Sequence, residues 1–279
     1  HRVMKYHFND DRLEFCLGDL RDYETLSQHL KNIDTVFHAG ALKQIPYVEF
    51  HPMEAIKTNT LSAFNVMKAC DERGVKKVIA ISTDKACQPV NSYGMSKALM
   101  EKIFIGDDVE SETVFSCVRY GNVLGSRGSV LPVWDKMIHE GKPIPVTSFK
   151  MRRFFLTLDQ AVGLILFTHK TMKGNEIFVA KAPVIKISDL ASVYAYTQTG
   201  DRNYPLNEIG IRAGEKLDEM LISQEEMYYT EDLGDYFRIN RPENYSTTTF
   251  SPEEYSSQTA PMLNFDEIHN TIKDLEWRK

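Results

Sequence analysis

Short apolar runs alternate with helical patterns along the first 120 residues, and this alternation limits the folds that the chain can adopt. The patterns predict strands at residues 13–17, 35–38, 77–82 and 114–118, and helices at residues 22–31, 52–73 and 93–105. Asp22 is a helix-start signal and Gly74 a helix-stop signal. Strands that alternate with helices form βαβ units with right-handed crossovers. We therefore expect an α/β fold with a doubly wound parallel sheet.

The pattern changes after about residue 122, where glycine and proline become frequent. Helices are predicted at residues 130–140, 158–170 and 265–275, and a strand at residues 176–179. Residues 241–261 are rich in Ser, Thr and Pro, which favours an extended or loop conformation. This half of the chain is predicted to form a smaller region that covers the sheet edge.

Composition and charge exclude several classes of protein. The net charge of −6 argues against nucleic-acid binding. The longest strongly apolar stretch, residues 161–167, is much shorter than the roughly 20 residues of a membrane span. The four cysteines show no C-x-x-C spacing, so we expect buried free thiols and no metal site. These features together predict a cytoplasmic protein that binds neither nucleic acid nor membrane.

Tyr93 and Lys97 form a Y-x-x-x-K pattern on a predicted helix. The spacing of four places both side chains on one face of that helix. An ammonium group favours phenolate, so we expect Lys97 to lower the pKa of Tyr93 from about 10 toward neutrality. A tyrosine of this kind can take the proton from a sugar hydroxyl. The spacing is common, however, and on its own it favours a solvated pair without a role in catalysis.

A polar run, Ser82-Thr83-Asp84-Lys85, follows the predicted strand at residues 77–82. In doubly wound folds, ligands lie at the carboxyl ends of the strands. The alternative is a solvated loop in which Asp84 and Lys85 form an ion pair of little energetic value. The succession of a buried strand, S-T-D-K and Y-x-x-x-K is much rarer by chance than any of its parts, and it favours a catalytic site.

Two further sets of residues are candidates for ligand contacts. The run from Arg119 to Val123 follows the next predicted strand, and it fits either an ordinary turn or a platform for a flat ring such as nicotinamide. A basic set fits either a solvated face or a diphosphate clamp, because guanidinium groups match phosphate oxygens. Its members are Arg119, Arg127, Lys142, Lys150, Arg152, Arg153 and Arg212.

These runs resemble the extended short-chain dehydrogenase/reductase superfamily, and within it the inverting UDP-N-acetylglucosamine 4,6-dehydratases of the pseudaminic-acid type. The matching runs include F-H-A-G-A at residues 37–41, S-T-D-K-A at 82–86, Y-G-M-S-K at 93–97 and I-R-A-G-E-K at 211–216. The resemblance implies a Rossmann-like domain at residues 1–125. It implies a mainly substrate-binding region at residues 126–279, with some segments that return to the first domain. It also implies a homo-oligomer, a hexamer.

The resemblance assigns roles to the polar run and the Y-x-x-x-K pair. Tyr93, tuned by Lys97, takes the C4 hydroxyl proton while hydride leaves C4. Lys85 then removes the C5 proton, and Asp84 helps to protonate the departing C6 hydroxyl. Thr83 hydrogen-bonds the sugar near C4, hydride returns to C6, and C5 is reprotonated from the opposite face. A base must be neutral, so we expect burial or a nearby cation to lower the pKa of Lys85.

The resemblance also implies a cofactor, NADP or NAD, and a substrate, UDP-N-acetylglucosamine. The implied cofactor contacts are Asp19, Leu20, Ala39, Gly40, Ala41, Lys43, Asn59, Ser82, Tyr93, Lys97, Tyr120, Asn122 and Val123. The implied substrate contacts are Lys43, Thr83, Lys85, Asn122, Ser129, Val130, Arg152, Arg212 and Glu215.

The family pattern begins with a strand, a G-G-T-G-x-x-G loop, a helix and a second strand that selects the cofactor ribose, and this sequence contains none of them. We expect the sequence to be incomplete at its N-terminus, and a degenerate relative without a cofactor is the alternative. NAD and NADP stay undistinguished, because the selecting segment is absent. Two other functions remain open: a UDP-sugar 4-epimerase, which needs no base at Lys85, and a non-catalytic nucleotide-sugar-binding protein.

Overall fold

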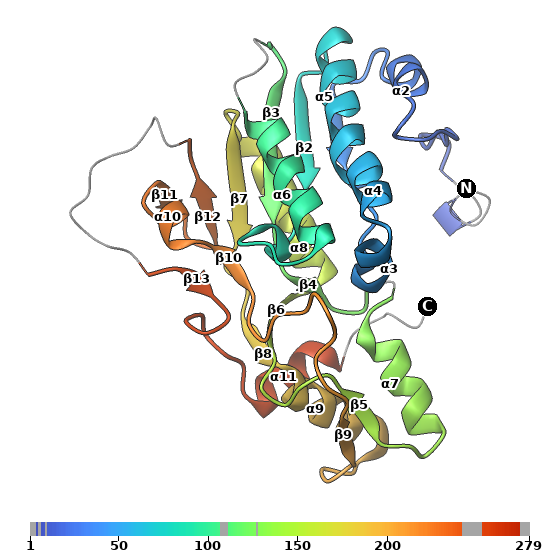
Figure 1. Cartoon of the computed structure of the whole chain (residues 1–279), viewed down its shortest axis with the longest axis vertical. Coiled ribbons are helices and arrows are strands. Elements are labelled where there is room, and N and C mark those ends of the chain that lie inside the picture. The colour runs from blue at the N-terminus through green and yellow to red at the C-terminus, as the bar shows by residue number, and fades with distance from the viewer. Residues whose placement is uncertain are drawn as a thin grey trace.

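The computed structural model describes residues 4, 7, 8, 10–106, 111–126, 128–241 and 253–273. A six-stranded sheet in the order β1-β2-β3-β7-β12-β11 forms its centre (Figure 1). The parallel strands are β1 (Thr35–His38), β2 (Lys77–Ile81), β3 (Val114–Arg119) and β7 (Glu176–Ala180). β12 (Tyr236–Ile239) and β11 (Thr230–Asp232) add an antiparallel edge. The predicted parallel sheet is confirmed, and its antiparallel extension went unpredicted.

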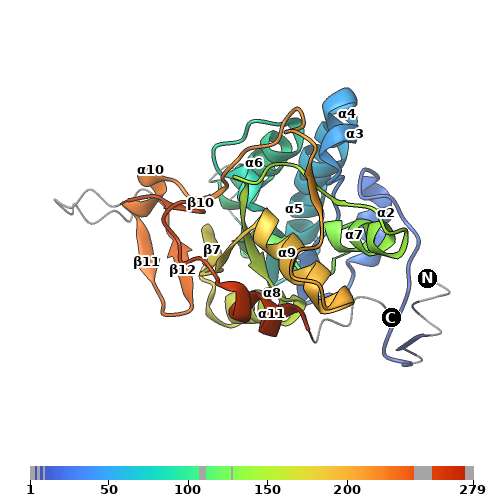
Figure 2. The ribbon, with the colours of Figure 1, turned by 90° about the horizontal axis from the view of Figure 1, so that it is seen from below.

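Helices cover both faces of the sheet, as Figure 2 shows. α5 (Ser62–Glu72) and α6 (Ser92–Ile105) pack on one face, and α8 (Leu158–Thr171) packs on the other. β2 shows why both faces are apolar: Val78 belongs to the core under α5 and α6, and Ile79 to the core under α8. Successive side chains of a strand point to opposite faces, so a strand covered twice is apolar throughout.

The predicted helices are present, with one irregularity. Residues 22–31 form α2 (Tyr23–His29), and the Asp22 side chain accepts from two backbone N–H groups at its start. The predicted helix at residues 52–73 is α4 (Pro52–Ala55), a π-helical turn η1 (Ile56–Leu61) and α5 in succession. A short helix that was not predicted, α3 (Ile45–Phe50), precedes them.

The strand predicted at residues 13–17 is wrong. These residues form no strand, and the side chain of Leu17 is 87% exposed. A strand needs a hydrogen-bonding neighbour. In the described part of the chain, β1 lies at the sheet edge and pairs with β2 alone, so residues 13–17 have no strand beside them.

A smaller region lies at one end of the sheet, at the bottom of Figure 1. Two small sheets belong to it: β4 (Asn122–Val123) with β6 (Arg152–Leu156) and β8 (Val184–Lys186), and β5 (Ile144–Val146) with β9 (Leu206–Glu208). Its helices are α7 (Val130–His139), α9 (Ile187–Thr199) and α11 (Phe265–Ile272). A third small sheet, β10 (Met220–Ile222) with β13 (Tyr255–Ser256), and the helix α10 (Gln224–Met227) lie beside β12 and β11, on the left of Figure 1. α7, α8, α11 and β7 confirm the predictions for this half.

The second half of the chain also contributes to the main sheet, through β7, β11 and β12. The segment predicted to be extended is loop and short strand at residues 253–261, and residues 242–252 lie outside the described residues. Three of the four free cysteines, Cys70, Cys87 and Cys117, are buried, and Cys16 is exposed. Among the described residues there is no cluster that could hold a metal ion, and no helix long and apolar enough to cross a bilayer.

Truncation of Phe178 should destabilise the fold through the core under α8. Its side chain is fully buried on β7. Phe178→Ala should lower the free energy of unfolding by about 3–5 kcal/mol. Leu17→Ala is the control, because Leu17 is 87% exposed, and its effect should stay within about 0.5 kcal/mol. Urea denaturation followed by circular dichroism measures both, and equal midpoints for the two variants would contradict the placement of this core.

Candidate active site

The two polar runs predicted at strand ends lie side by side. The backbone N–H of Ser82 donates to the carbonyl of Val118 at 2.7 Å, and that of Asp84 donates to the carbonyl of Tyr120 at 3.0 Å. These bonds extend the pairing of β2 and β3 beyond the strands themselves. S-T-D-K and the residues after Arg119 therefore share the carboxyl edge of the sheet, where doubly wound folds bind ligands.

A one-turn 3₁₀ helix, η2 (Asp84–Ala86), carries the acidic and basic groups of this edge. Thr83 caps it, and its hydroxyl donates to Asp84 Oδ1 at 2.9 Å. Lys85 Nζ lies 2.8 Å from the same oxygen. Asp84 is fully buried, and its Oδ2 has no hydrogen-bond partner within the described residues. The geometry joins a carboxylate and an ammonium group directly and leaves one carboxylate oxygen for another donor.

The helix that carries Tyr93 and Lys97 is packed tightly against this turn. A Cβ at Gly94 would lie 2.2 Å from the backbone oxygen of Lys85. Asn91 caps α6 by accepting from the Gly94 N–H, and its amide donates to the carbonyl of Gly214. Both contacts are 2.7 Å long. Glycine at position 94 therefore sets the distance between Tyr93 and the turn that holds Lys85.

The pKa of Tyr93 is raised, whereas a lowered pKa was expected. Burial raises it, and the positive charge of Lys85 and a hydrogen bond with Thr83 only partly oppose this effect. The prediction that Lys97 lowers the pKa of Tyr93 is therefore wrong. The cation that acts on the Tyr93 phenol is Lys85, and not Lys97.

Lys97 lies deeper, beneath the sheet edge. Its side chain is buried, and Nζ donates to the sulfur of Met100 at 2.8 Å. Burial lowers the pKa of Lys97 to about 8. His38, at the end of β1, is buried too; burial and the charge of Lys97 lower its pKa to about 4. A buried ammonium group beside a thioether is poorly satisfied, so Lys97 fits a ligand with oxygen acceptors.

The pKa of Lys85 also shifts in the direction opposite to the expected one. Burial lowers it, but the negative charges of Asp84 and Glu219 outweigh burial and the nearby charge of Arg153, so the pKa is raised. The expected lowering of the Lys85 pKa is wrong, because the two carboxylates near Lys85 have a larger effect than the one cation. In the free chain Lys85 is an ammonium ion.

The predicted cofactor path at residues 39–43 is held by a buried amide. Asn59, in the π-helical turn η1, accepts from the Leu42 N–H at 2.7 Å and donates to the Leu42 carbonyl at 2.9 Å. It also donates to Ser96 Oγ on α6. At the other side of this loop, a Cβ on Gly40 would lie 2.1 Å from Leu20 Cδ1. The loop is thus fixed between α6 and residue 20.

The remaining predicted cofactor residues lie around this loop and at the end of β3. Asp19 is exposed and paired with Arg21 at 2.7 Å, which lowers the pKa of Asp19 to about 2. Tyr120 is half-buried, and burial together with Tyr93 raises its pKa to about 12. Ala39, Lys43 and Asn122 are exposed, whereas Gly40, Ala41 and Val123 are partly buried.

Arg119 lies in the protein interior, whereas its sequence context suggested a ligand contact. Its guanidinium is 2% exposed and donates to both carboxylates of Glu101 and Glu226 and to the carbonyl of Leu221. Ser82, a predicted cofactor contact, donates to the same Glu101 at 2.5 Å. Arg119 is therefore a buried structural cation, and the prediction that it belongs to a phosphate clamp is wrong. Arg127 lies outside the described residues.

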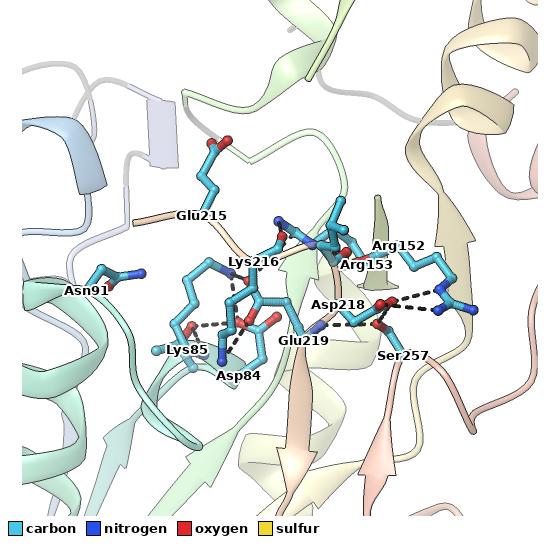
Figure 3. Close-up of polar contacts among 12 residues, drawn as sticks. Asp84, Lys85, Asn91, Arg152, Arg153, Glu215, Lys216, Asp218, Glu219 and Ser257 are labelled. Atoms are coloured by element: carbon cyan, nitrogen blue, oxygen red, sulfur yellow. Dashed lines mark hydrogen bonds and ion pairs between the residues drawn. The ribbon is translucent and has the colours of Figure 1, made fainter. Parts of the chain in front are cut away.

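Figure 3 shows two of the predicted substrate residues, Arg152 and Glu215, on segments near η2. Arg152 pairs with Asp218 at 2.7 Å, which raises the pKa of Arg152. Arg212 is exposed, and its backbone N–H donates to Glu215 at 3.3 Å. Ser129 is the N-cap of α7, directly before the exposed Val130. The Asn91–Gly214 hydrogen bond connects this segment to α6.

The sequence patterns missed one buried carboxylate at the site, Glu219. It is 3% exposed and lies within 3.8 Å of three cations, Lys85, Arg153 and Lys216. A cavity of about 220 Å³ adjoins it, lined in part by Gln88, Lys216 and Gln258. A larger hollow of about 400 Å³, around residues 4–15, lies away from these groups. No local pattern pointed to Glu219, because two of its charge partners, Lys85 and Arg153, lie far from it in sequence.

A family model described as polysaccharide biosynthesis protein matches residues 1–241. The chain belongs to this family, part of the extended short-chain dehydrogenase/reductase superfamily. The chain is 45% identical over 237 residues to a Campylobacter jejuni protein named UDP-N-acetylglucosamine 4,6-dehydratase (inverting). The match covers 84% of this chain and 69% of that relative. A Rickettsia bellii protein named UDP-glucose 4-epimerase is 40% identical, with 98% of this chain and 84% of the relative covered.

Solved structures of this superfamily share the fold. The X-ray structure of Pen from Bacillus thuringiensis has a TM-score of 0.90 and 36% identity, and the match covers 98% of this chain and 86% of that one. DesIV from Streptomyces venezuelae, a dTDP-glucose 4,6-dehydratase with NAD bound, has a TM-score of 0.71 and 18% identity. That match covers 78% of this chain and 73% of DesIV. The α/β Rossmann-like fold predicted from the sequence is confirmed.

Gly94→Ala should disturb the site through the close approach of α6 to η2. The added methyl group would meet the Lys85 carbonyl at 2.2 Å, so the helix or the turn must move. We expect turnover to fall at least tenfold, since a shift of about 1 Å in a catalytic group costs about 100-fold. Gly163→Ala on α8 is the matched control, because its Cβ would meet nothing closer than 3.4 Å. Unchanged turnover in Gly94→Ala would contradict the packing described here.

His38 should make stability depend on pH between about 4 and 6.5. The unfolded chain binds a proton at this residue below pH 6.5, whereas the folded chain stays neutral down to about pH 4. Its contribution to stability is therefore full above pH 6.5 and is lost as the pH falls toward 4. A difference of about 2.5 pKa units corresponds to about 3 kcal/mol. Urea unfolding at pH 4.5 and 7 should show a smaller difference in His38→Gln than in the exposed control His139→Gln.

Proposed function

We propose that this chain is an inverting UDP-N-acetylglucosamine 4,6-dehydratase of the pseudaminic-acid type that works with NADP or NAD. The observation that carries the proposal is the Asp84–Lys85 pair, 2.8 Å apart and beside Tyr93 at the carboxyl edge of the sheet. Oxidation at C4 needs only one base, whereas loss of water across C5 and C6 needs a second base and an acid. The 45% identical Campylobacter jejuni relative carries the name of this activity.

The residues present fit a nicotinamide dinucleotide. The poorly satisfied ammonium group of Lys97 suits the hydroxyls of a ribose, and the braced loop at residues 39–43 provides a fixed wall. Asp19 and Leu20 would flank the adenine, and Tyr120, Asn122 and Val123 would lie by the nicotinamide. The remaining contacts would come from Ala39, Gly40, Ala41, Lys43, Asn59 and Ser82. When bound, the cofactor supplies the oxidation at C4 and the reduction at C6.

Tyr93 takes the proton of the C4 hydroxyl in this proposal. Its pKa is raised by burial, so the phenol needs help to lose its own proton. The positive charge of Lys85 and the hydrogen bond with Thr83 both favour phenolate. Thr83 thus acts on Tyr93 as well as on the sugar near C4.

Asp84 and Lys85 act as an acid and a base by exchanging one proton. The free chain holds an ammonium and a carboxylate 2.8 Å apart. Transfer of the proton from Lys85 Nζ to Asp84 Oδ1 yields a neutral amine and a carboxylic acid, and burial favours this uncharged form. The amine then takes the C5 proton, and the acid donates its proton to the C6 oxygen, which leaves as water. The raised pKa of Lys85 is compatible with this route because its partner accepts the proton.

The UDP group would contact the segments that face η2. Arg212 is exposed on the loop anchored by Asn91, and it would bind the diphosphate. Arg152 would contribute after leaving Asp218, its partner in the free chain. Glu215, Ser129, Val130 and Lys43 would complete this side of the pocket.

We also propose a cytoplasmic homo-oligomer, a hexamer. The exposed apolar side chains of Tyr47, Phe50 and Met53 on α3 and α4, with Phe64 on α5 and Leu99 on α6, support an interface between copies. Analytical ultracentrifugation of the whole chain measures the assembly, and a monomer at working concentration would contradict it.

A UDP-sugar 4-epimerase is the second candidate function. The Rickettsia bellii epimerase matches a larger share of this chain than the dehydratase does, 98% against 84%. Both activities would use Tyr93 and Lys97, so the two candidates differ at C5 and C6 of the sugar.

The deciding experiment incubates the protein with UDP-N-acetylglucosamine and NADP or NAD in D₂O and follows the sugar by NMR. The proposal expects loss of one water, a new C6 methyl group, deuterium at C5 and inverted configuration at C5. Retained configuration would overturn the inverting assignment. A C4 epimer with C6 intact would establish the epimerase instead, and an unchanged sugar would overturn both.

Lys85→Ala should separate the two halves of the reaction. Without the amine the C5 proton cannot be removed, so dehydration should fall by at least about 100-fold, the lower range of general-base contributions. Oxidation at C4, seen as reduced nicotinamide in a single turnover, should continue at a lower rate, because Tyr93 loses the charge of Lys85 that favours phenolate. Lys76→Ala, with a largely exposed side chain, is the control and should retain activity. Dehydration at the normal rate in Lys85→Ala would remove the proposed base.

A further inference from the structure

Glu219 enters the site from a part of the chain distant from η2. It lies directly before β10, and its backbone N–H and carbonyl both form hydrogen bonds with Ser257. The Glu219 N–H donates to Ser257 Oγ at 3.1 Å, and the Ser257 N–H donates to the Glu219 carbonyl at 2.8 Å. The pairing of β10 with β13 continues these contacts. The position of this carboxylate is therefore fixed by the second half of the chain.

The three cations around Glu219 each have their closest contacts elsewhere. Arg153 donates to the carbonyls of residues 152, 216 and 217, and Lys216 donates to those of residues 87 and 88. Lys85 is closest to Asp84. Glu219 Oε2 has no hydrogen-bond partner among the residues described, although Lys216 lies 3.4 Å away (Figure 3). Glu219 thus acts on its neighbours through its charge.

The groups that face Lys85 come from four elements. Asp84 lies on η2 itself, Tyr93 on α6, Arg153 on β6, and Glu219 on the segment before β10. Asp84 and Glu219 are the two carboxylates among them. In the proposed route, Asp84 is protonated when Lys85 takes the C5 proton. At that moment Glu219, 3.7 Å from Nζ, is the remaining negative charge beside the new ammonium ion.

We propose that Glu219 is a positioning residue for proton removal at C5: it stabilises the Lys85 ammonium while Asp84 is protonated. This role rests on the proposed dehydratase function. The residue touches neither the sugar nor the cofactor, and it makes Lys85 a stronger base. Lys216 opposes the effect, because its positive charge partly offsets that of Glu219.

The test compares Glu219→Gln with the wild-type protein, using UDP-N-acetylglucosamine and its C5-deuterated form. An opposite charge at this distance moves a pKa by about 1–3 units. In the variant, the falling limb of the pH–rate profile, where the pair loses its shared proton, should therefore move to lower pH by about 1 unit or more, and dehydration should slow about tenfold. Reduced nicotinamide should accumulate, and the C5 isotope effect on turnover should increase. Oxidation at C4 should keep its rate.

Three further variants separate a charge effect from a structural one. Glu219→Asp keeps the charge and should recover most of the pH profile. Lys216→Gln should move the falling limb in the opposite direction, to higher pH. Glu225→Gln, an exposed residue on α10, is the matched control and should behave as the wild type. If Glu219→Gln fails to fold, the pH profiles of Glu219→Asp and Lys216→Gln decide the question.

Four results would overturn the inference. An unchanged pH profile and isotope effect in Glu219→Gln would show that the charge is not used, as would an unchanged limb in Lys216→Gln. Equal losses of C4 oxidation and dehydration in a folded Glu219→Gln would indicate a structural role. A wild-type protein that forms no dehydrated sugar would remove the proposed function, and this inference with it. The wild-type reaction distinguishes this last result from the other three.

Discussion

The buried guanidinium of Arg119 holds together the parts on which the site depends. It lies at the end of β3, binds Glu101 on α6, and binds Glu226 and the Leu221 carbonyl in the segment after Glu219. Removing one partner of such a pair typically costs about 3–5 kcal/mol, because the other charge is left uncompensated. The sheet edge, the helix with Tyr93 and Lys97, and β10 are therefore fixed relative to one another by one cation.

Electrostatics at the site differ from those of isolated side chains. Tyr93, Lys97 and Lys85 all lie where water is largely excluded, and burial alone would favour the neutral form of each. Lys97 follows that tendency, whereas Lys85 is kept charged by Asp84 and Glu219. The pKa values of these two buried lysines thus shift in opposite directions because of where the carboxylates lie. A proton can then move within the Asp84–Lys85 pair without any exchange with solvent.

Local patterns in the sequence were sufficient for most elements in the first half of the chain. The short apolar runs and the cap at Asp22 predicted β1–β3 and α2, and the strand-end rule predicted that Asp84 and Tyr120 share one edge. Residues 13–17 are also a short apolar run but have no neighbouring strand, which a local pattern cannot reveal. In the second half, α9 and the bounds of most strands went unpredicted. The role of Arg119 and the presence of Glu219 were missed because most of their partners are far away in sequence, and because burial and charge depend on the whole fold.

The π-helical turn η1 has a consequence for insertions and deletions. A π turn accommodates one residue more than an α turn, and here it includes Asn59, whose amide holds the loop at residues 39–43. Loss of one residue between 56 and 61 would restore a regular helix from α4 to α5. Because the turn itself holds the extra residue, the helices on either side would keep their orientation after this loss, and the shift would fall on the side chains of the turn. A deletion here would therefore leave the packing of α4 and α5 largely as it is and remove the support that Asn59 gives to the loop at residues 39–43.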